Sequence, residues 1–125
     1  MIVITGASEG LGLEVAKLFK NDGKKVVNIS LTDYIVADIN MIYDLTEGKQ
    51  IEMAAKDVIA LDEPLEVLIN CVGVWTNEPI GEITEKEIKR TMASNVKSTI
   101  LLTSNLIAKI KKDGSDIANV SSIAG

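Results

Sequence analysis

Histidine does not occur in the 125 residues, and cysteine occurs once, as Cys71. One thiol cannot close an internal disulfide, and a zinc ion would find only carboxylates as ligands, which is not typical of structural zinc sites. We therefore expect no metal site. The missing histidine also removes the base that activates the nucleophile of Ser-His-acid hydrolases.

Aromatic residues and positive charge are scarce: aromatics make up 3% of the chain, and the formal net charge is -5. Nucleic-acid binding needs Lys and Arg to neutralise phosphates, and single-strand binding needs aromatic side chains for stacking. We expect no nucleic-acid partner. Apolar runs fall short of the roughly 20 residues of a membrane span, and no basic leader with an apolar signal segment precedes the first glycine. The expected protein is soluble and cytoplasmic, with no membrane contact.

Short apolar runs alternate with segments of helical period along the whole chain. Strands are expected over 2–4, 25–30, 39–43, 65–70 and 117–121, and helices over 11 to about 22, 49–61 and 88–111. Mostly apolar strands that alternate with helices predict a parallel sheet buried between helices on both faces. The sequence therefore indicates a single α/β domain over residues 1–125, a doubly wound, three-layer α/β/α arrangement of about five strands.

The longest predicted helix has a broad apolar surface. Thr84 and Glu87 have the spacing of a capping box, which places the start of this helix. Its apolar positions extend beyond the stripe that one sheet face would cover: Ile88, Met92, Val96, Ile100, Leu101, Leu102, Leu106, Ile107 and Ile110. Two explanations stay open, a contact with another subunit in a homo-oligomer and burial in the protein's own core.

The first glycine-rich segment, MIVITGASEGLG, allows two interpretations. Gly6, Ser8 and Gly10 fit the G-x-S-x-G turn that presents a nucleophilic serine. Gly6, Gly10 and Gly12 also fit a turn that brings backbone N–H groups and the positive end of a helix to a phosphate. Because no histidine is present to activate Ser8, we favour the phosphate-binding interpretation, in which Ser8 is a hydrogen-bond donor.

The segment 5–12, TGASEGLG, resembles the T-G-x-x-x-G-x-G motif of the short-chain dehydrogenase/reductase family. Further matches follow in the family's order: Asp44-Leu45 after the third strand, Asn70-Cys71-Val72-Gly73 for N-N-A-G, Asn95 in the long helix, and the run Asn119-Val120-Ser121-Ser122-Ile123-Ala124-Gly125. The 27 positions between Asn95 and Ser122 are close to the family's spacing between its helix asparagine and its active-site serine. The resemblance implies a Rossmann-like fold that binds a dinucleotide.

The resemblance also implies a role for individual residues. Gly6, Gly10, Leu11 and Gly12 would hold the pyrophosphate, assisted by Ser8. The adenine would lie against Asp44 and Leu45, and the path to the nicotinamide ribose would be lined by Asn70, Val72 and Gly73. Asn95 would be the catalytic asparagine, and Ser122 would orient the substrate.

The positions that select between NAD and NADP in the family carry neither expected signature. They correspond to Ser30, Leu31 and Glu9, where an acid on the second strand would bind the ribose 2′-OH or a base would bind the 2′-phosphate. Glu9 would repel a phosphate, and Asp33 is close enough in sequence to reach the ribose. The expected cofactor is NAD or NADP, with NAD favoured.

The family's catalytic Tyr-x-x-x-Lys pair does not occur in the 125 residues, because Asp38 stands four residues after Tyr34 and Glu47 four after Tyr43. Loss of a positioned acid or base typically lowers a rate by about 10²–10⁴. We therefore expect the cofactor-binding portion of a longer, truncated oxidoreductase, which transfers hydride between a nicotinamide and a carbonyl or alcohol. The alternative is an inactive, stand-alone nucleotide-binding module that covers its fifth strand with another copy of itself. The segment 31–40 is short for the family's second crossover helix.

Overall fold

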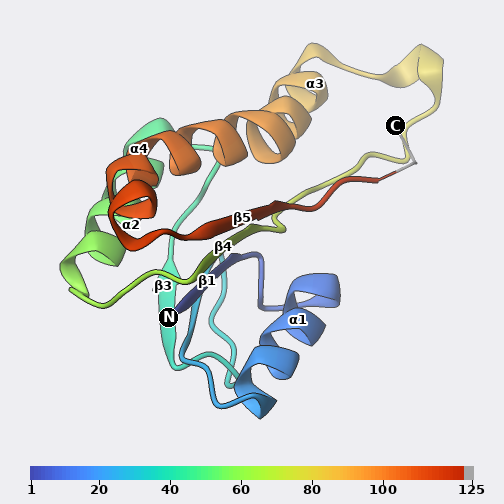
Figure 1. Cartoon of the computed structure of the whole chain (residues 1–125). Coiled ribbons are helices and arrows are strands. Elements are labelled where there is room, and N and C mark those ends of the chain that lie inside the picture. The colour runs from blue at the N-terminus through green and yellow to red at the C-terminus, as the bar shows by residue number, and fades with distance from the viewer. Residues whose placement is uncertain (123–125) are drawn as a thin grey trace.

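The computed structural model describes residues 1–122, and a five-stranded parallel sheet lies at its centre (Figure 1). The strands follow the order β3-β2-β1-β4-β5 across the sheet. Their bounds are β1 Ile2–Thr5, β2 Val26–Ser30, β3 Ile39–Ile42, β4 Val67–Asn70 and β5 Asp116–Asn119. The helical elements are α1 Gly10–Asn21, α2 Gly48–Ala60, η1 Ile80–Glu82, α3 Glu85–Met92, η2 Ala93–Lys97 and α4 Ser98–Asp113.

Helices cover both faces of the sheet, which confirms the predicted three-layer α/β/α fold (Figure 1). Successive side chains of a strand point to opposite faces, so the strands contribute to two cores. One core joins Val3 and Leu68 of the sheet to α2 and α4, and the other joins Ile4 and Val26 to α1. All four residues of β1 are buried because this strand is central in the sheet.

The chain reverses its direction of progress across the sheet after β3. It passes from β1 to β2 and β3 on one side, and then returns to β4 on the other side of β1. Ile2 is accordingly in register with both Val26 and Val67. In doubly wound sheets a crevice opens at the carboxyl ends of the two strands where the order reverses, here β1 and β4. The segments that follow Thr5 and Asn70 therefore lie at the place where ligands bind in such folds.

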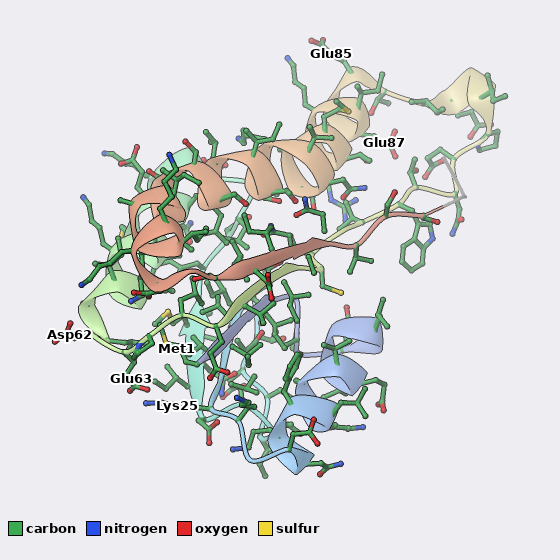
Figure 2. All side chains as sticks on the ribbon, viewed as in Figure 1. Met1, Lys25, Asp62, Glu63, Glu85 and Glu87 are labelled. Atoms are coloured by element: carbon green, nitrogen blue, oxygen red, sulfur yellow. The ribbon has the colours of Figure 1, made fainter. Side chains whose placement is uncertain are left out.

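The amino ends of the strands carry paired charges instead. The Met1 ammonium is paired with the Glu66 carboxylate at 3.4 Å, and Lys25 is paired with Glu63 (Figure 2). These groups lie at the opposite edge of the sheet from the glycine-rich turn.

The predicted long helix is interrupted, although its start is confirmed. The Thr84 hydroxyl accepts from the Glu87 N–H at 3.3 Å, and the Glu87 carboxylate accepts from the Thr84 N–H at 3.0 Å. Glu87 lies in the first turn of α3 (Figure 2). After α3 the chain widens into the π-helical segment η2 before α4 begins.

The apolar surface of this helical unit is divided between the core and the exterior. Leu102, Leu106 and Ile110 are buried, together with the small residues Ser94 and Ser98. Ile88, Met92, Val96 and Ile100 are between 41% and 61% exposed, and Leu101 and Ile107 are partly exposed beside them. The first four of these form what we call the outer stripe. Burial in the chain's own core therefore does not explain the outer stripe.

Some boundaries differ from the prediction. The Leu65 N–H donates to the Asp113 carboxylate at 2.8 Å instead of a neighbouring strand, so β4 begins at Val67. This bond, and then the ion pair with Lys109 at 2.9 Å, hold the pKa of Asp113 below its usual value.

No helix forms between β2 and β3 in the described chain, in line with the short predicted segment, and η1 was not predicted. Among residues 1–122, no helix is long and apolar enough to cross a bilayer.

Candidate functional site

The glycine-rich turn joins β1 to α1 and requires glycine for two reasons, a positive φ and a close approach of backbone atoms. Gly6 and Gly10 have positive φ values of 71° and 56°, which L side chains rarely adopt. Gly12 has an ordinary φ, but a Cβ built there would lie 2.3 Å from the Gly6 carbonyl oxygen. The first turn of α1 therefore packs directly on the backbone of the turn, and only a residue without a side chain permits this approach.

The first amides of α1 have no hydrogen-bond partner among the described residues. The first helical bond runs from the Leu13 N–H to the Glu9 carbonyl at 3.2 Å, and the Glu9 side chain does not cap the helix. Within residues 1–122, no hydrogen bond is recorded for the N–H groups of Gly10, Leu11 and Gly12. Such groups carry the positive end of the helix dipole and bind anions. Ser8, which is half-buried and lies two residues before Gly10, adds a hydroxyl.

Thr5 connects the glycine-rich turn to the segment after β4. Its Oγ1 accepts hydrogen bonds from the N–H groups of both Cys71 and Val72, each at 3.0 Å. A Cβ on Gly6 would lie 3.1 Å from the Val72 Cα, so the two segments pass each other closely. Burial raises the pKa of the Cys71 thiol. Thr5 was not among the predicted site residues, although its place at the start of the T-G motif was a usable signal.

Asn70 fixes β4 to the neighbouring β5 and α4. Its Nδ2 donates to the Asn119 Oδ1 at 2.9 Å and to the Thr103 Oγ1 at 3.2 Å. The Asn70 Oδ1 is buried and has no hydrogen-bond donor among the described residues. A buried acceptor left without any donor costs about 1–3 kcal/mol. This atom is therefore suited to accept a hydrogen bond from a water molecule or a ligand group.

The Asn95 side chain holds the loop after β4 by hydrogen bonds to the backbone of that loop. Its Oδ1 accepts from the Val74 N–H and its Nδ2 donates to the Val74 carbonyl, both at 2.8 Å. A Cβ on Gly73 would lie 3.5 Å from the Asn95 Oδ1, so the structure brings these two predicted residues together. Asn95 lies in η2, and π-helical turns of this kind are frequent at functional sites. Both polar atoms of the side chain are occupied by the loop.

Ser30 and Leu31, at two of the positions expected to select between NAD and NADP, differ in their exposure. The Ser30 side chain is buried, and its hydroxyl donates to the Thr32 carbonyl, so it points into the protein. Leu31, the next residue, is 67% exposed.

The residues after β3 are held by a local turn. The Asp44 Oδ1 accepts from the Thr46 N–H at 2.9 Å and from the Thr46 hydroxyl at 2.7 Å. Leu45 is 4% exposed and belongs to the core beneath α2.

Ser122 is exposed and lies three residues beyond the end of β5. The remainder of the predicted motif, residues 123–125, lies outside the described part of the chain.

A groove of about 920 Å³ runs along the outer stripe, and no residue of the glycine-rich turn lines it. Thr46 and Glu47 before α2 complete its lining, and apolar and cationic side chains form most of it: Met92, Ala93, Val96, Ile100, Leu101, Lys86, Lys89, Arg90 and Lys97. It contains none of the predicted site residues.

The fold, the turn and the order of the motifs agree with a comparison to known families, in which residues 1–125 match the family described as short chain dehydrogenase. The chain belongs to the short-chain dehydrogenase family. An uncharacterized oxidoreductase of Thermotoga maritima is 30% identical to this family member, over 100% of the chain and 54% of the relative's own length.

Solved structures of the family support the same assignment. The ligand-free aldohexose dehydrogenase of Thermoplasma acidophilum has a TM-score of 0.86 at 26% identity, over 97% of this chain and 49% of its own. A short-chain dehydrogenase of Leptospira borgpetersenii with bound NAD+ has a TM-score of 0.89 at 22% identity, over 98% of this chain and 51% of its own. At that identity the likeness shows the fold alone. This short-chain dehydrogenase chain spans about half the length of the relatives it matches.

Proposed function

We propose that residues 1–125 form a single dinucleotide-binding domain of a short-chain oxidoreductase. The observation that carries the proposal is the row of unpartnered N–H groups at Gly10, Leu11 and Gly12, packed against the glycine-rich turn. A diphosphate supplies the acceptor oxygens and the negative charge that these groups lack. The proposed location is the cytoplasm, where proteins rarely rely on disulfides, in line with the single cysteine.

The remaining site residues have complementary roles in this proposal. The adenine lies against Asp44 and Leu45, and the segment Asn70, Val72 and Gly73 borders the nicotinamide ribose. The unpartnered Asn70 Oδ1 can accept a hydrogen bond from that ribose or from a water molecule beside it. The nicotinamide, when bound, accepts or donates hydride.

In this proposal Asn95 and Ser122 lie where the substrate binds beside the nicotinamide. Asn95 holds the loop at Val74 in place, and the Ser122 hydroxyl orients a small carbonyl or alcohol substrate. Hydride transfer by the family's mechanism also needs the tyrosine and lysine of the Tyr-x-x-x-Lys motif, which the 125 residues do not contain. We therefore assign cofactor binding to this chain, and catalysis to a protein that carries both this chain and that motif.

We further propose a preference for NAD over NADP. Glu9 and Asp33 are exposed acids next to the glycine-rich turn and on the β2–β3 loop, and a 2′-phosphate would meet both charges. The Ser30 hydroxyl is turned inward, where it donates to the Thr32 carbonyl. Asp33 is then the first acid after β2 in the sequence that can accept a hydrogen bond from the ribose 2′-OH. Asp33→Asn should weaken NAD binding about tenfold, since a hydrogen bond to a charged group contributes about 1.5–3 kcal/mol. Calorimetric titration of both cofactors tests the preference, and tighter binding of NADP would contradict it.

Calorimetry and amide NMR test the binding itself. Addition of NAD should release or absorb heat with a stoichiometry of one and should shift the amide signals of Gly10, Leu11 and Gly12. The amide of Gly48, at the start of α2 and outside the proposed site, is the internal control and should not move. No heat and no shift at these three amides with either dinucleotide would refute the proposal.

A self-associating, catalytically inactive nucleotide-binding module is the second candidate. All four residues of β5 are exposed, and the outer stripe presents apolar side chains to the exterior. Exposed strand edges and apolar patches of this kind favour association. The intact mass of the natural protein separates the candidates, because a native mass of 13.4 kDa per chain supports the module and a larger one supports the oxidoreductase.

A further inference from the structure

Asn28 is a polar residue in the middle of β2, and its side chain is completely buried. Neighbouring β2 residues Val27 and Ile29 belong to the core beneath α2 and α4, so Asn28 faces the side of α1. A buried amide destabilises a fold unless both its oxygen and its nitrogen find partners. The partners of Asn28 therefore indicate what the residue does.

The oxygen end of the Asn28 side chain holds the glycine-rich turn. Its Oδ1 accepts from the Ala7 N–H at 3.0 Å, and the preceding Gly6 N–H donates to the Ile29 carbonyl at 2.9 Å. Two adjacent residues of the turn are thus fixed to β2. Ala7 is itself buried, so its N–H has no access to water if the Asn28 oxygen is removed. The unpartnered amides at the start of α1 follow three residues later.

The nitrogen end of the same side chain holds the loop between β2 and β3. Its Nδ2 donates to the Asn40 Oδ1 at 2.9 Å, across a registered pair of β2 and β3. Asn40 in turn brackets Tyr34: its Oδ1 accepts from the Tyr34 N–H at 3.1 Å, and its Nδ2 donates to the Tyr34 carbonyl at 3.0 Å. The Asn28 Nδ2 also lies 3.0 Å from the Ser30 Oγ, whose hydroxyl donates to Thr32.

We propose that Asn28 is a positioning residue for cofactor binding, which sets the glycine-rich turn and the β2–β3 loop relative to each other. This inference rests on the proposed function, in which the turn holds the pyrophosphate and the loop borders the adenosine ribose. One rigid amide spans both segments, so the two halves of the site are presented at a fixed separation before the ligand arrives. Preorganisation of this kind increases affinity because the ordering cost is met during folding.

An aliphatic replacement tests the inference. In the 125-residue chain, Asn28→Leu keeps the approximate size of the side chain and removes both ends of the link. We expect a dissociation constant for NAD about tenfold higher by calorimetry, and faster hydrogen exchange at the Ala7 and Tyr34 amides. Asn40→Leu, which cuts only the loop side, should raise the dissociation constant severalfold and accelerate exchange at Tyr34 but not at Ala7.

A matched control separates positioning from general loss of stability. Val58→Ala removes buried volume from α2, on the opposite face of the sheet, and should lower the unfolding midpoint while the dissociation constant for NAD stays within about twofold. If Asn28→Leu does not fold, Asn40→Leu decides the question in its place. Unchanged NAD binding in the folded Asn28 variant, or in its substitute, overturns the inference alone. A wild-type chain that binds neither NAD nor NADP overturns the proposed function and this inference with it.

Discussion

The close contact between α1 and the glycine-rich turn makes Gly12→Ala the most informative single substitution. An added Cβ would lie 2.3 Å from the Gly6 carbonyl oxygen, 2.9 Å from the Gly6 carbonyl carbon and 3.2 Å from the Ala7 Cα. All three are backbone atoms of a turn that is hydrogen-bonded to β2, so a side-chain rotation cannot relieve the overlap. The helix and the turn must therefore move apart.

The expected cost follows from two opposing effects. Overpacking in a tight site costs about 1–3 kcal/mol, and alanine gains at most about 1 kcal/mol over glycine in a helix. We expect Gly12→Ala to lower the free energy of unfolding by about 1–2 kcal/mol. Because the amides of Gly10 and Leu11 move with the helix, we also expect NAD to bind at least about tenfold more weakly, a loss of about 1.4 kcal/mol.

Urea unfolding followed by circular dichroism, together with calorimetric titration of NAD, measures both effects. Gly48→Ala is the matched control, because Gly48, like Gly12, lies in the first turn of a helix with an ordinary φ, but has no described atom within 4 Å of an added Cβ. This control should leave NAD binding unchanged and stability unchanged or slightly higher. If Gly12→Ala matches Gly48→Ala in both measurements, the argument from close packing is wrong.

Gly10→Ala isolates the effect of backbone conformation. The φ of Gly10 is 56°, but an added Cβ would meet no atom within 4 Å. The expected loss is therefore the cost of the left-handed conformation alone, about 1–2 kcal/mol.

Four further measurements test other parts of the structure. The pKa of the Asp113 carboxyl lies below its usual value, so the stabilisation of the fold by the ionised carboxylate is complete above about pH 4 and is lost as the pH falls through the lowered pKa. Asp113→Asn should therefore make the urea midpoint less dependent on pH below about 4. Asn95→Ala removes both bonds to Val74, and hydrogen exchange at the Val74 amide should become about tenfold faster. The thiol of Cys71, with its pKa raised by burial, should react with iodoacetamide more slowly in the folded chain than in urea at pH 8, and equal rates would contradict this. If the outer stripe joins two copies, sedimentation equilibrium should show a dimer for the wild type and a monomer for Ile100→Glu, whereas monomers for both would exclude this interface.

Local patterns were sufficient to predict the order of the elements. The apolar run of β1, the glycine-rich turn and the capping box at Thr84 each express a rule that operates within a few residues. Each is found in the structure within a residue or two of its expected place. The alternation of apolar strands with helices also predicted the parallel sheet, and the family resemblance, carried by motifs in order along the chain, implied the Rossmann-like fold.

The apolar period could not show which side of the long helical unit is buried. Both sides are apolar, and the side that packs inward begins with Ser94 and Ser98, whose small side chains permit a close approach to the core. The π-helical turn around Asn95 shifts the register between α3 and α4, and a hydrophobic period does not reveal one extra residue.

Polar contacts between distant segments were also beyond the reach of local patterns. Asn28 appeared only as one amide in an apolar strand, and its partners lie on β3 and in the turn after β1. Ser30 was assigned to a position that selects between NAD and NADP, and its spacing could not show that its hydroxyl donates to the Thr32 carbonyl. Alternation along a strand predicts the face of a side chain, whereas the choice of partner depends on neighbours that are remote in sequence.

The central position of β1 in the sheet has a consequence during synthesis of the protein. Ile2 is synthesised before its partner Val67 on β4, which is made 65 residues later. At roughly 5–20 residues per second, one edge of this apolar strand waits about 3–13 s for its neighbour during translation. Throughout that interval the nascent segment is a natural client for chaperones that recognise extended aliphatic peptides.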